Sequence, residues 1–164
     1  MQLNKKSKIF IAGHNGMVGS SVMRHFKREG YKNLFFKSRK SLNLIDQKKT
    51  HSYLKKIKPD FVISAAAKVG GIFINKEEKA KFIYENIMIQ TNLIHSSFLN
   101  GVKKLIFLGS SCIYPKFSKQ PIKEEYLMTG KLEETNDAYA VAKLAGYKMC
   151  DAYNKQYKLS LIHI

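Results

Sequence analysis

Short apolar runs alternate along this chain with longer segments in which apolar residues recur every three or four positions. The short runs have the length and composition of buried strands, and they cover residues 8–12, 33–37, 60–65 and 104–108. The longer segments are typical of helices with one buried face, and they cover residues 17–28, 46–58, 79–100 and 137–157. Because strands and helices alternate regularly, the pattern predicts an α/β fold, a Rossmann-like doubly wound parallel sheet with helices on both faces.

The apolar stripes identify the face that each helix is expected to bury. The stripe of the first helix consists of Met17, Val18, Val22 and Phe26, and that of the third consists of Phe82, Ile83, Ile87, Ile94 and Phe98. Right-handed crossovers between parallel strands place the loops that follow the strands along one carboxyl edge of the sheet. Ligand chemistry is expected at that edge.

Glycine, proline and polar residues mark where these elements end. A glycine follows the first and the third predicted helix, and Pro59 breaks the helical pattern before the third strand. Asn136 or Asp137 caps the last helix, after a polar loop over residues 118–136. With 164 residues, 45% of them hydrophobic, and no internal repeat or linker, the chain has the size of one domain, which we assign to residues 1–158.

The loop between the first strand and the first helix reads Gly13-His14-Asn15-Gly16-Met17-Val18-Gly19. A strand that turns directly into a helix needs glycine where φ is unusual and where a side chain would hold a phosphate away from the backbone. The helix N-terminus then supplies free N–H donors for an anion. The loop therefore predicts a site for the pyrophosphate of a dinucleotide. Its spacing differs from the more common G-x-G-x-x-G, and an ordinary structural turn is the alternative.

Basic residues follow the second strand, where an enzyme that selects NAD usually carries an acidic residue for the ribose 2′-hydroxyl. The sequence there is Lys37-Ser38-Arg39-Lys40. A guanidinium and neighbouring ammonium groups suit a 2′-phosphate, which a carboxylate would repel. We therefore predict NADP as the cofactor, with Arg39 as its principal contact. A basic surface turn in a lysine-rich chain is the alternative.

A tyrosine and a lysine four positions apart, Tyr139 and Lys143, lie on one face of the last predicted helix. An ammonium beside a phenol favours the phenolate, so we expect the pKa of Tyr139 to fall towards the working pH and its hydroxyl to exchange protons with a carbonyl or an alcohol. Ser110, just after the fourth strand, can hydrogen-bond the same oxygen. The pair alone is common in amphipathic helices, but the glycine loop, the serine and the pair, in this order, are strong evidence together.

Charge and composition restrict the partners. The net charge is +17, but the lysines are spread over the whole chain and match no nucleic-acid motif, so we interpret them as solvated helix faces and expect no specific nucleic-acid partner. Two cysteines and no signal peptide favour the cytoplasm. The five histidines are scattered, which predicts no metal site, and no apolar run has the length of a membrane span.

These motifs resemble the extended short-chain dehydrogenase/reductase family, and within it the branch of the GDP-L-fucose synthases. The resemblance covers nearly all of residues 8–157, and the segments that carry it are 11–19, 65–72, 109–116, 120–121 and 135–140. The segments 68–72 (Lys-Val-Gly-Gly-Ile) and 110–116 (Ser-Ser-Cys-Ile-Tyr-Pro-Lys) are specific to this branch, and the others belong to the whole superfamily. The resemblance implies NADPH-dependent epimerisation and reduction of GDP-4-keto-6-deoxy-D-mannose to GDP-L-fucose.

The resemblance also implies a role for each matching residue. The cofactor-binding residues would be Gly13, His14, Asn15, Gly16, Met17, Val18 and Gly19 at the pyrophosphate, Arg39, Lys40, Ser41, Leu42, Asn43 and Leu44 around the adenosine end, and Leu108, Gly109, Ser110, Ser111 and Lys143 at the nicotinamide half. The catalytic residues would be Ser110, Cys112, Tyr139 and Lys143. Tyr139 would protonate the C4 oxygen of the substrate as hydride arrives, Ser110 would orient that oxygen, and Lys143 would hold the nicotinamide ribose. Cys112 would remove the acidic protons beside the ketone, although a lone cysteine is more usually a small buried hydrophobe.

The chain departs from the family pattern at three places. Asn15 stands where many members carry arginine, so the preference for NADP depends more on Arg39. The family continues with a catalytic histidine and a C-terminal domain that binds the GDP-sugar, and these residues contain neither. Residues 159–164 fit the pattern poorly, so we expect a non-native tail there, although they are apolar enough to begin another strand. We therefore expect an incomplete sheet without the substrate domain, from a parent enzyme that forms a homodimer.

Three functions are compatible with this sequence. The leading one is the cofactor-binding and partial catalytic region of an enzyme of this branch, with a GDP-sugar as substrate and little or no turnover from this chain alone. The first alternative is another nucleotide-sugar epimerase, dehydratase or reductase of the superfamily, which would carry different residues at Cys112 and at 68–72. The second is an NADP-binding module without catalysis.

Overall fold

A computed structural model describes the chain at residues 2–158 and 160–163. Its strands are β1 (Ile9–Ala12), β2 (Leu34–Phe35), β3 (Phe61–Ser64), β4 (Lys104–Phe107) and β5 (Ser160–His163). Its helices are α1 (Met17–Arg28), α2 (Gln47–Ile57), α3 (Ile72–Glu77), α4 (Lys79–Leu99) and α5 (Asp137–Tyr157), with short 3-10 turns η1 (Ser111–Ile113) and η2 (Glu124–Tyr126). Each strand and long helix that the hydrophobic pattern predicts is present, with ends that differ by a few residues at most. The pattern did not predict α3, η1 or η2.

The strands of the described residues run parallel in the order β2-β1-β3-β4-β5. Ile9 of β1 pairs with Phe61 of β3, and Phe61 pairs in turn with Lys104 of β4. The chain adds β2 on one side of β1 and then crosses to add β3 on the other side. This change of direction is a topological switch point, and α/β proteins bind ligands at the carboxyl ends of the strands there. The predicted parallel α/β fold is confirmed.

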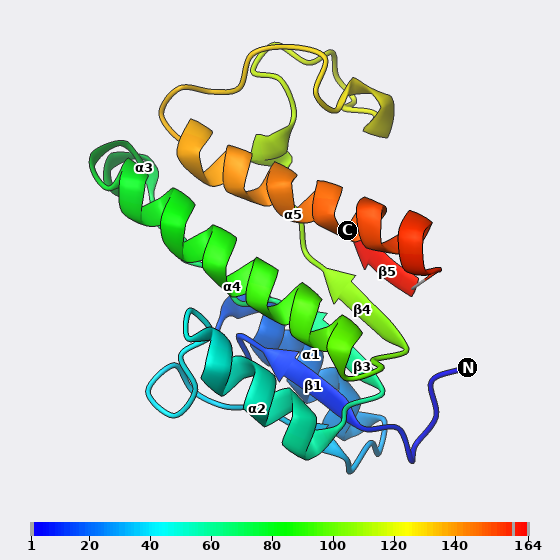
Figure 1. Cartoon of the computed structure of the whole chain (residues 1–164). Helices are drawn as coiled ribbons and strands as arrows, with labels where there is room; N and C mark the ends of the chain where they lie inside the picture. Colours follow the sequence, from blue (N-terminus) through cyan, green and yellow to red (C-terminus); the bar gives the residue numbers. More distant parts are fainter. Residues whose placement is uncertain (1, 159, 164) are drawn as a thin grey trace.

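Helices cover both faces of the sheet (Figure 1). α2, α4 and α5 lie over one face, where Phe10 and Val62 point into the larger core cluster. α1 covers the other face, where Ile9 and Ile63 form a smaller cluster with Met23. Because successive side chains of a strand point to opposite faces, alternate positions of β1 and β3 supply the two cores. The doubly wound arrangement that the sequence predicts is therefore present.

The N-terminal end of α1 does not bury the face that its apolar stripe predicts. Val22 and Phe26 pack against the smaller core cluster as expected. Met17 and Val18 are 87% and 43% exposed, because they lie at the cavity along the carboxyl edge and not over the sheet. An amphipathic pattern cannot distinguish an apolar side chain in the core from one beside a ligand cavity.

α4 buries polar side chains along with its apolar stripe. Phe82 and Ile94 of the stripe are fully buried, while its other members are only half-buried. The same helix buries Glu85, Asn86, Gln90 and Asn92. Buried polar groups are normally hydrogen-bonded, and three of these side chains bind backbone groups outside α4. α4 therefore anchors neighbouring segments as well as covering the sheet.

The N-terminal caps of α2 and α5 differ. The Asp46 carboxylate accepts a hydrogen bond of 2.9 Å from the backbone N–H of Lys49, which satisfies a free donor of the first turn of α2. Asn136 is the N-cap of α5, as predicted, but its side chain makes no hydrogen bond to the helix. The side chain of Asn136 is therefore directed elsewhere.

β5 lies beside β4 and pairs with it in register, Leu105 with Leu161 and Ile106 with Ile162. A strand over these positions agrees with their apolar pattern. The described part ends at residue 163, and residues 159 and 164 lie outside it. The expectation that residues 159–164 are a non-native tail stays a prediction, because a strand pattern explains their place in the sheet whatever their origin.

Candidate active site and cofactor pocket

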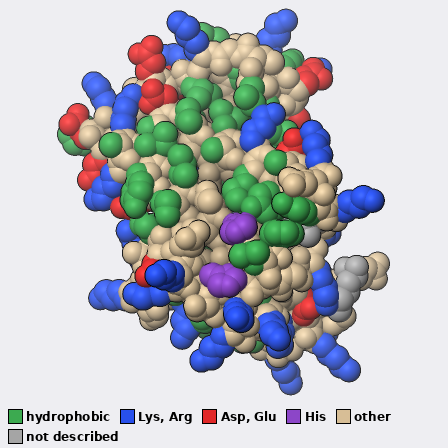
Figure 2. All heavy atoms as spheres, viewed as in Figure 1, with side chains coloured by type: hydrophobic (Ala, Val, Ile, Leu, Met, Phe, Trp, Pro, Cys, Tyr) green, Lys and Arg blue, Asp and Glu red, His purple; other side chains and the backbone are tan. Residues whose placement is uncertain are grey.

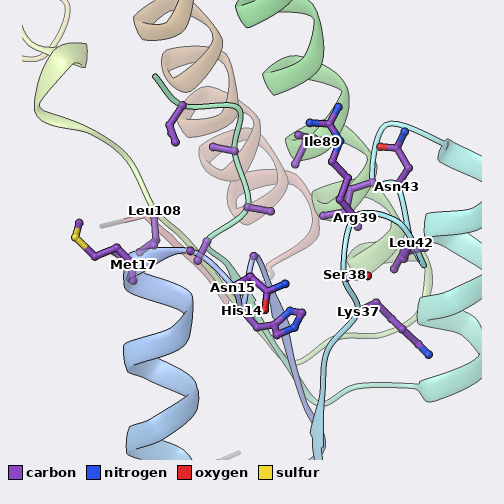
Figure 3. A pocket seen from close by; sticks show the side chains of 18 of the residues that line it. His14, Asn15, Met17, Lys37, Ser38, Arg39, Leu42, Asn43, Ile89 and Leu108 are labelled. Carbon is purple, nitrogen blue, oxygen red and sulfur yellow. The ribbon is translucent and has the colours of Figure 1, made fainter. Parts of the chain in front are cut away.

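A cavity of about 460 Å³ opens at the carboxyl edge of the sheet. Its walls come from the loops after β1, β2, β3 and β4 and from the start of α5 (Figure 3). The lining residues are 13–18, 37–39, 42–44, 65–67, 69, 89, 108–109, 139 and 143. Segments distant in the sequence therefore meet at the edge where the topology predicts ligand binding.

The glycine loop leaves no space for side chains at two positions. Gly13 has φ +84°, and a Cβ atom there would lie 2.6 Å from the backbone of Ala65 and Ala66. A Cβ atom on Gly19 would lie 2.1 Å from the carbonyl oxygen of Gly13. The loop and the segment after β3 are thus in direct backbone contact, which only glycine permits. The first N–H groups of α1 have no side-chain cap, since the N-cap residue is Gly16, and they are available to an anion.

His14 contributes a polar atom that lacks a protein partner. Its ring lies beside that of Phe36, with centroids 4.8 Å apart. Its Nδ1 atom is buried, and it has no hydrogen-bond partner among the described residues. An orphaned polar atom on a cavity wall costs stability unless a ligand or a water satisfies it. The glycine backbone and the free end of α1 together fit a dinucleotide diphosphate.

The basic segment after β2 places a guanidinium at the cavity. The Arg39 Nη2 atom donates a hydrogen bond of 3.0 Å to Oε2 of Glu85, an ion pair in which the arginine side chain is 65% exposed and the glutamate side chain 8%. Glu85 comes from α4, so a buried carboxylate holds an exposed guanidinium in place. The donors of Arg39 that do not face Glu85 suit a phosphate group. Lys40 and Ser41 of the same segment are exposed and do not line the cavity.

Amide side chains of α4 hold the loops that form the cavity walls. Asn92 donates to the carbonyl oxygens of Leu44 and Ile45, at 2.8 and 2.9 Å. Asn86 both accepts from the Lys68 N–H at 2.8 Å and donates to the Lys68 carbonyl at 3.0 Å. These bonds connect α4 to the loops after β2 and β3. α4 therefore supports these two loops of the cavity wall from behind.

The predicted reaction residues come together after β4 and at the start of α5, where Tyr139 and Lys143 line the cavity. The Ser110 hydroxyl hydrogen-bonds Tyr139, and Cys112 lies close enough to the same phenol to influence its pKa. Lys143 is 4% exposed, and its Nζ atom donates a hydrogen bond of 2.9 Å to the carbonyl oxygen of Leu108. The same atom lies 5.9 Å from the ring centroid of Tyr139. The four residues thus form one cluster of acid–base groups.

The pKa of Tyr139 does not fall as the Tyr–Lys spacing led us to expect. Burial raises it, the hydrogen bond from Ser110 opposes that rise, and a charge on Cys112 raises it further. Burial also lowers the pKa of Lys143 to about 8, and this ammonium is directed at Leu108 and not at the phenol. The prediction was wrong because it took sequence spacing as contact and ignored the cost of burying charge. Tyr139 is a protonated acid in this structure.

The cavity contains some residues that the sequence missed and excludes others that it predicted. Several residues line the wall although the sequence analysis did not assign them to the cofactor: Lys37, Ser38, Val69, Ile89 and residues 65–67. The three alanines after β3 were a usable signal, because small side chains let a ligand approach the backbone. Six predicted site residues lie outside the cavity wall, namely Gly19, Lys40, Ser41, Ser110, Ser111 and Cys112. Gly19 lies beneath the loop, and Ser110 and Cys112 lie beside Tyr139 at the rim.

Comparison with known proteins identifies the family. A model of the NAD dependent epimerase/dehydratase family matches residues 9–164. The chain belongs to this family. GDP-L-fucose synthase 1 of Arabidopsis thaliana is 53% identical over 154 residues, which are 94% of this chain and 48% of that protein. GDP-L-fucose synthase of Escherichia coli (strain K12) is 51% identical over 152 residues, which are 93% of this chain and 47% of that protein.

Solved structures agree with this family assignment. MlghC, a GDP-mannoheptose C4 reductase from Campylobacter jejuni with NADP bound, is 43% identical and superimposes with a TM-score of 0.96, covering 99% of this chain and 51% of that chain. The resemblance to the GDP-L-fucose synthase branch is confirmed. This epimerase/dehydratase-family chain spans about half the length of the curated relatives it matches. No helix in the described part is long and apolar enough to cross a membrane.

Proposed function

We propose that this chain is the NADPH-binding and partial catalytic region of a GDP-L-fucose synthase. The observation that carries the proposal is a single cavity along which Arg39, the glycine loop, and then Leu108 with Lys143 and Tyr139 follow one another. That order matches a dinucleotide whose diphosphate lies between a 2′-phosphorylated adenosine and a reacting nicotinamide. Relatives at 51% and 53% identity carry the name GDP-L-fucose synthase, and a solved structure at 43% identity has NADP bound.

At the cofactor end, the backbone of 13–19 would hold the diphosphate and Arg39 the 2′-phosphate. Residues 42–44 would surround the adenosine, and 108–111 would lie beside the nicotinamide. When bound there, NADPH supplies the hydride for reduction. The glycines of the loop leave its backbone open to the phosphates, because no side chain projects from these positions.

At the reaction end, the raised pKa of Tyr139 suits the role of proton donor. Tyr139 would protonate the C4 oxygen of the keto sugar, Ser110 would orient that oxygen, and Lys143 would hold the nicotinamide ribose. Cys112 would act as the base that removes the protons beside the ketone during epimerisation. These assignments combine the family resemblance with the cluster that the structure brings together.

We also propose a homodimer in the cytoplasm, with no specific nucleic-acid partner. The face formed by α4 and α5 gathers hydrophobic side chains, with Lys and Arg around it (Figure 2). Tyr84, Leu99, Val141 and Tyr157 of these helices are exposed. Apolar patches of this kind are typical of interaction surfaces. A second copy of the chain, packed through the same two helices, would cover them.

The test is a calorimetric titration of NADPH and of NADH into the chain, its Arg39→Ala variant and a Lys40→Ala control. We expect NADPH to bind more tightly than NADH. Arg39→Ala should lower NADPH affinity about 10- to 100-fold, since it removes charge-assisted hydrogen bonds to a phosphate, and should leave NADH within about twofold. Lys40 is exposed and off the cavity wall, so its variant should bind NADPH as the wild type does. Equal affinity for both cofactors, unchanged by Arg39→Ala, would refute the proposal.

A second candidate is a reductase of the same superfamily that does not epimerise. It is favoured by the similarity to MlghC, which is named as a C4 reductase. Reduction needs only Ser110, Tyr139 and Lys143, whereas epimerisation needs a base such as Cys112 as well. The exchange of substrate protons with deuterated solvent distinguishes the two, because a reductase leaves the carbons beside the ketone unlabelled. The measurement requires the full-length enzyme, since we expect little or no turnover from this chain.

A further inference from the structure

The side chain of Asn136 is directed at Cys112. Its Nδ2 atom donates a hydrogen bond to the Cys112 sulfur, with a donor–acceptor distance of 3.2 Å. Asparagine at an N-cap normally accepts from the first turn of its helix, an interaction worth about 1 kcal/mol. Asn136 makes no such bond to α5. A good capping residue thus stands at the right position and binds a thiol instead.

Hydrogen bonds of the backbone hold both partners in place. The Asn136 N–H donates to the carbonyl of Glu133 at 3.2 Å, and the Asn136 carbonyl accepts from the N–H of Ala140 at 3.0 Å. On the other partner, the Cys112 N–H donates to the hydroxyl oxygen of Ser110 at 3.3 Å. Cys112 is therefore held between Ser110 and Asn136, and it is close enough to Tyr139 to influence the pKa of the phenol.

The second atom of the Asn136 amide is left without a partner. Oδ1 is buried and accepts no hydrogen bond among the described residues. An unsatisfied buried acceptor is unfavourable, and such groups occur where another constraint sets the orientation of the side chain. The contact between Nδ2 and the sulfur is the interaction that this orientation provides.

We propose that Asn136 is a positioning residue for Cys112, whose N–H donor stabilises the cysteine thiolate as a base. The inference rests on the proposed function, in which the thiolate removes a proton beside the ketone. In that step the C–H proton goes to sulfur and the C–H electron pair goes to the enolate of the ketone, so the thiolate becomes a thiol. A hydrogen bond to the charged form of an acid favours that form. Asn136 therefore increases the fraction of Cys112 that is ready to accept a proton.

Other titratable groups near Cys112 do not obscure this effect. Asp137 pairs with Lys79 at 2.8 Å, and Glu133 pairs with Lys116 at 2.9 Å. These interactions lower the pKa of both carboxyl groups, so both remain charged at neutral and alkaline pH. The pKa of Tyr139 is raised by burial, so its phenol loses its proton only at high pH. Burial lowers the pKa of Lys143, in the same cluster, to about 8, so this ammonium also titrates at mildly alkaline pH. Lys143 is the same in every variant, so the difference between the wild-type and Asn136-variant profiles reports on the thiol.

The test measures how the rate of alkylation by iodoacetamide depends on pH, with mass spectrometry to separate the two cysteines. Cys150 is fully buried and burial raises the pKa of its thiol to about 12, so its modification signals unfolding. The variants are Asn136→Leu, which removes the donor, and Asn136→Asp, which also adds a negative charge. Thr135→Val is the matched control, since it changes the adjacent residue and its bond to Glu133 without touching the donor.

We expect the midpoint of the Cys112 profile to rise by about one pH unit in Asn136→Leu, by more in Asn136→Asp, and to stay unchanged in Thr135→Val. Loosened packing alone would change the rate at every pH and leave the midpoint in place. An unchanged midpoint in both Asn136 variants overturns the inference. So does a downward shift, which would mean that the amide oxygen faces the S–H group. NADPH titrations of the same variants keep the two proposals separate, because a chain that shows the shift but binds no NADPH contradicts the proposed function alone.

Discussion

In the proposed site, the two ends of the cavity would recognise their ligand through different parts of the chain. At the diphosphate end the contacts would be mainly backbone atoms, and Gly13 and Gly19 leave no space for a Cβ atom. At the reaction end they would be the side chains of Ser110, Tyr139 and Lys143, which come from the loop after β4 and from α5. Backbone recognition depends on space and φ, so one added methyl group destroys it. Side-chain recognition depends on donors and charges, so its losses are graded.

The strongest test of this contrast compares two glycines with positive φ. A Cβ atom on Gly13 (φ +84°) would clash with the backbone of Ala65, whereas a Cβ atom on Gly30 (φ +78°) would meet no atom within 4 Å. Gly30→Ala should lower the free energy of unfolding by about 1–2 kcal/mol through φ alone and leave NADPH affinity unchanged. Gly13→Ala should lower the free energy of unfolding several-fold more than Gly30→Ala does, and it should lower NADPH affinity by about 100-fold or more. Denaturant unfolding and calorimetry measure both, and equal effects of the two variants would contradict the account.

A change of charge at Lys143, at the reaction end, should affect NADPH affinity less than Gly13→Ala does, and the effect should depend on pH. Burial lowers the pKa of Lys143 from 10.5 to about 8, so the ammonium is charged below that pH and neutral above it. We expect NADPH affinity to fall about threefold to tenfold between pH 7 and pH 9 as the charge is lost. Lys143→Met should remove this part of the pH dependence, and Lys148→Met, at an exposed position of the same helix, should retain it. Identical profiles for wild type and Lys143→Met would show that the charge has no role.

The stability of the fold should respond to the same titration in the opposite direction. The unfolded chain binds a proton at Lys143 up to about its ordinary pKa of 10.5, while the folded chain releases it near 8. Between these values the unfolded state holds more protons, so the contribution of Lys143 to stability rises with pH. If NADPH affinity falls with pH while the contribution of Lys143 to stability rises, the loss of affinity is a specific effect of Lys143 and not of general alkaline unfolding.

The smallest effect on binding is expected from Tyr139→Phe. In the proposed site the phenol oxygen, which hydrogen-bonds Ser110, would serve the substrate, whereas the diphosphate and the 2′-phosphate would bind nearer the glycine loop and Arg39. NADPH affinity by calorimetry should therefore stay within about twofold of the wild type, with a stability loss of about 1 kcal/mol for the lost hydrogen bond. A tenfold loss of affinity would mean that the hydroxyl is part of the cofactor site.

The fold and the glycine loop could be predicted because their causes are local. The strand pattern of 8–12, the glycines that follow it and the helix from Met17 to Arg28 are specified within about twenty neighbouring positions, and the structure has them where the pattern places them. The order of strands then follows from general rules of handedness. The cluster of Ser110 and Tyr139 was expected from the family resemblance, and the structure brings the two residues together.

The parts that could not be predicted depend on contacts between distant segments. Glu85 and Asn92 are polar residues on a buried face, and their burial makes sense only once Arg39 and the loop after β2 are seen against α4. The prediction that the pKa of Tyr139 falls was wrong for the same reason, since burial and the direction of Lys143 are properties of the packed structure. Periodicity identifies which face of a helix is buried, but not which polar groups find partners there.

The most direct test of the central claim is a crystal structure of the chain with NADPH. We expect the diphosphate on the backbone of 13–19, the 2′-phosphate within hydrogen-bond distance of Arg39, and the nicotinamide between Leu108 and Tyr139. Binding in the reverse direction, or at any place outside this cavity, would contradict the claim.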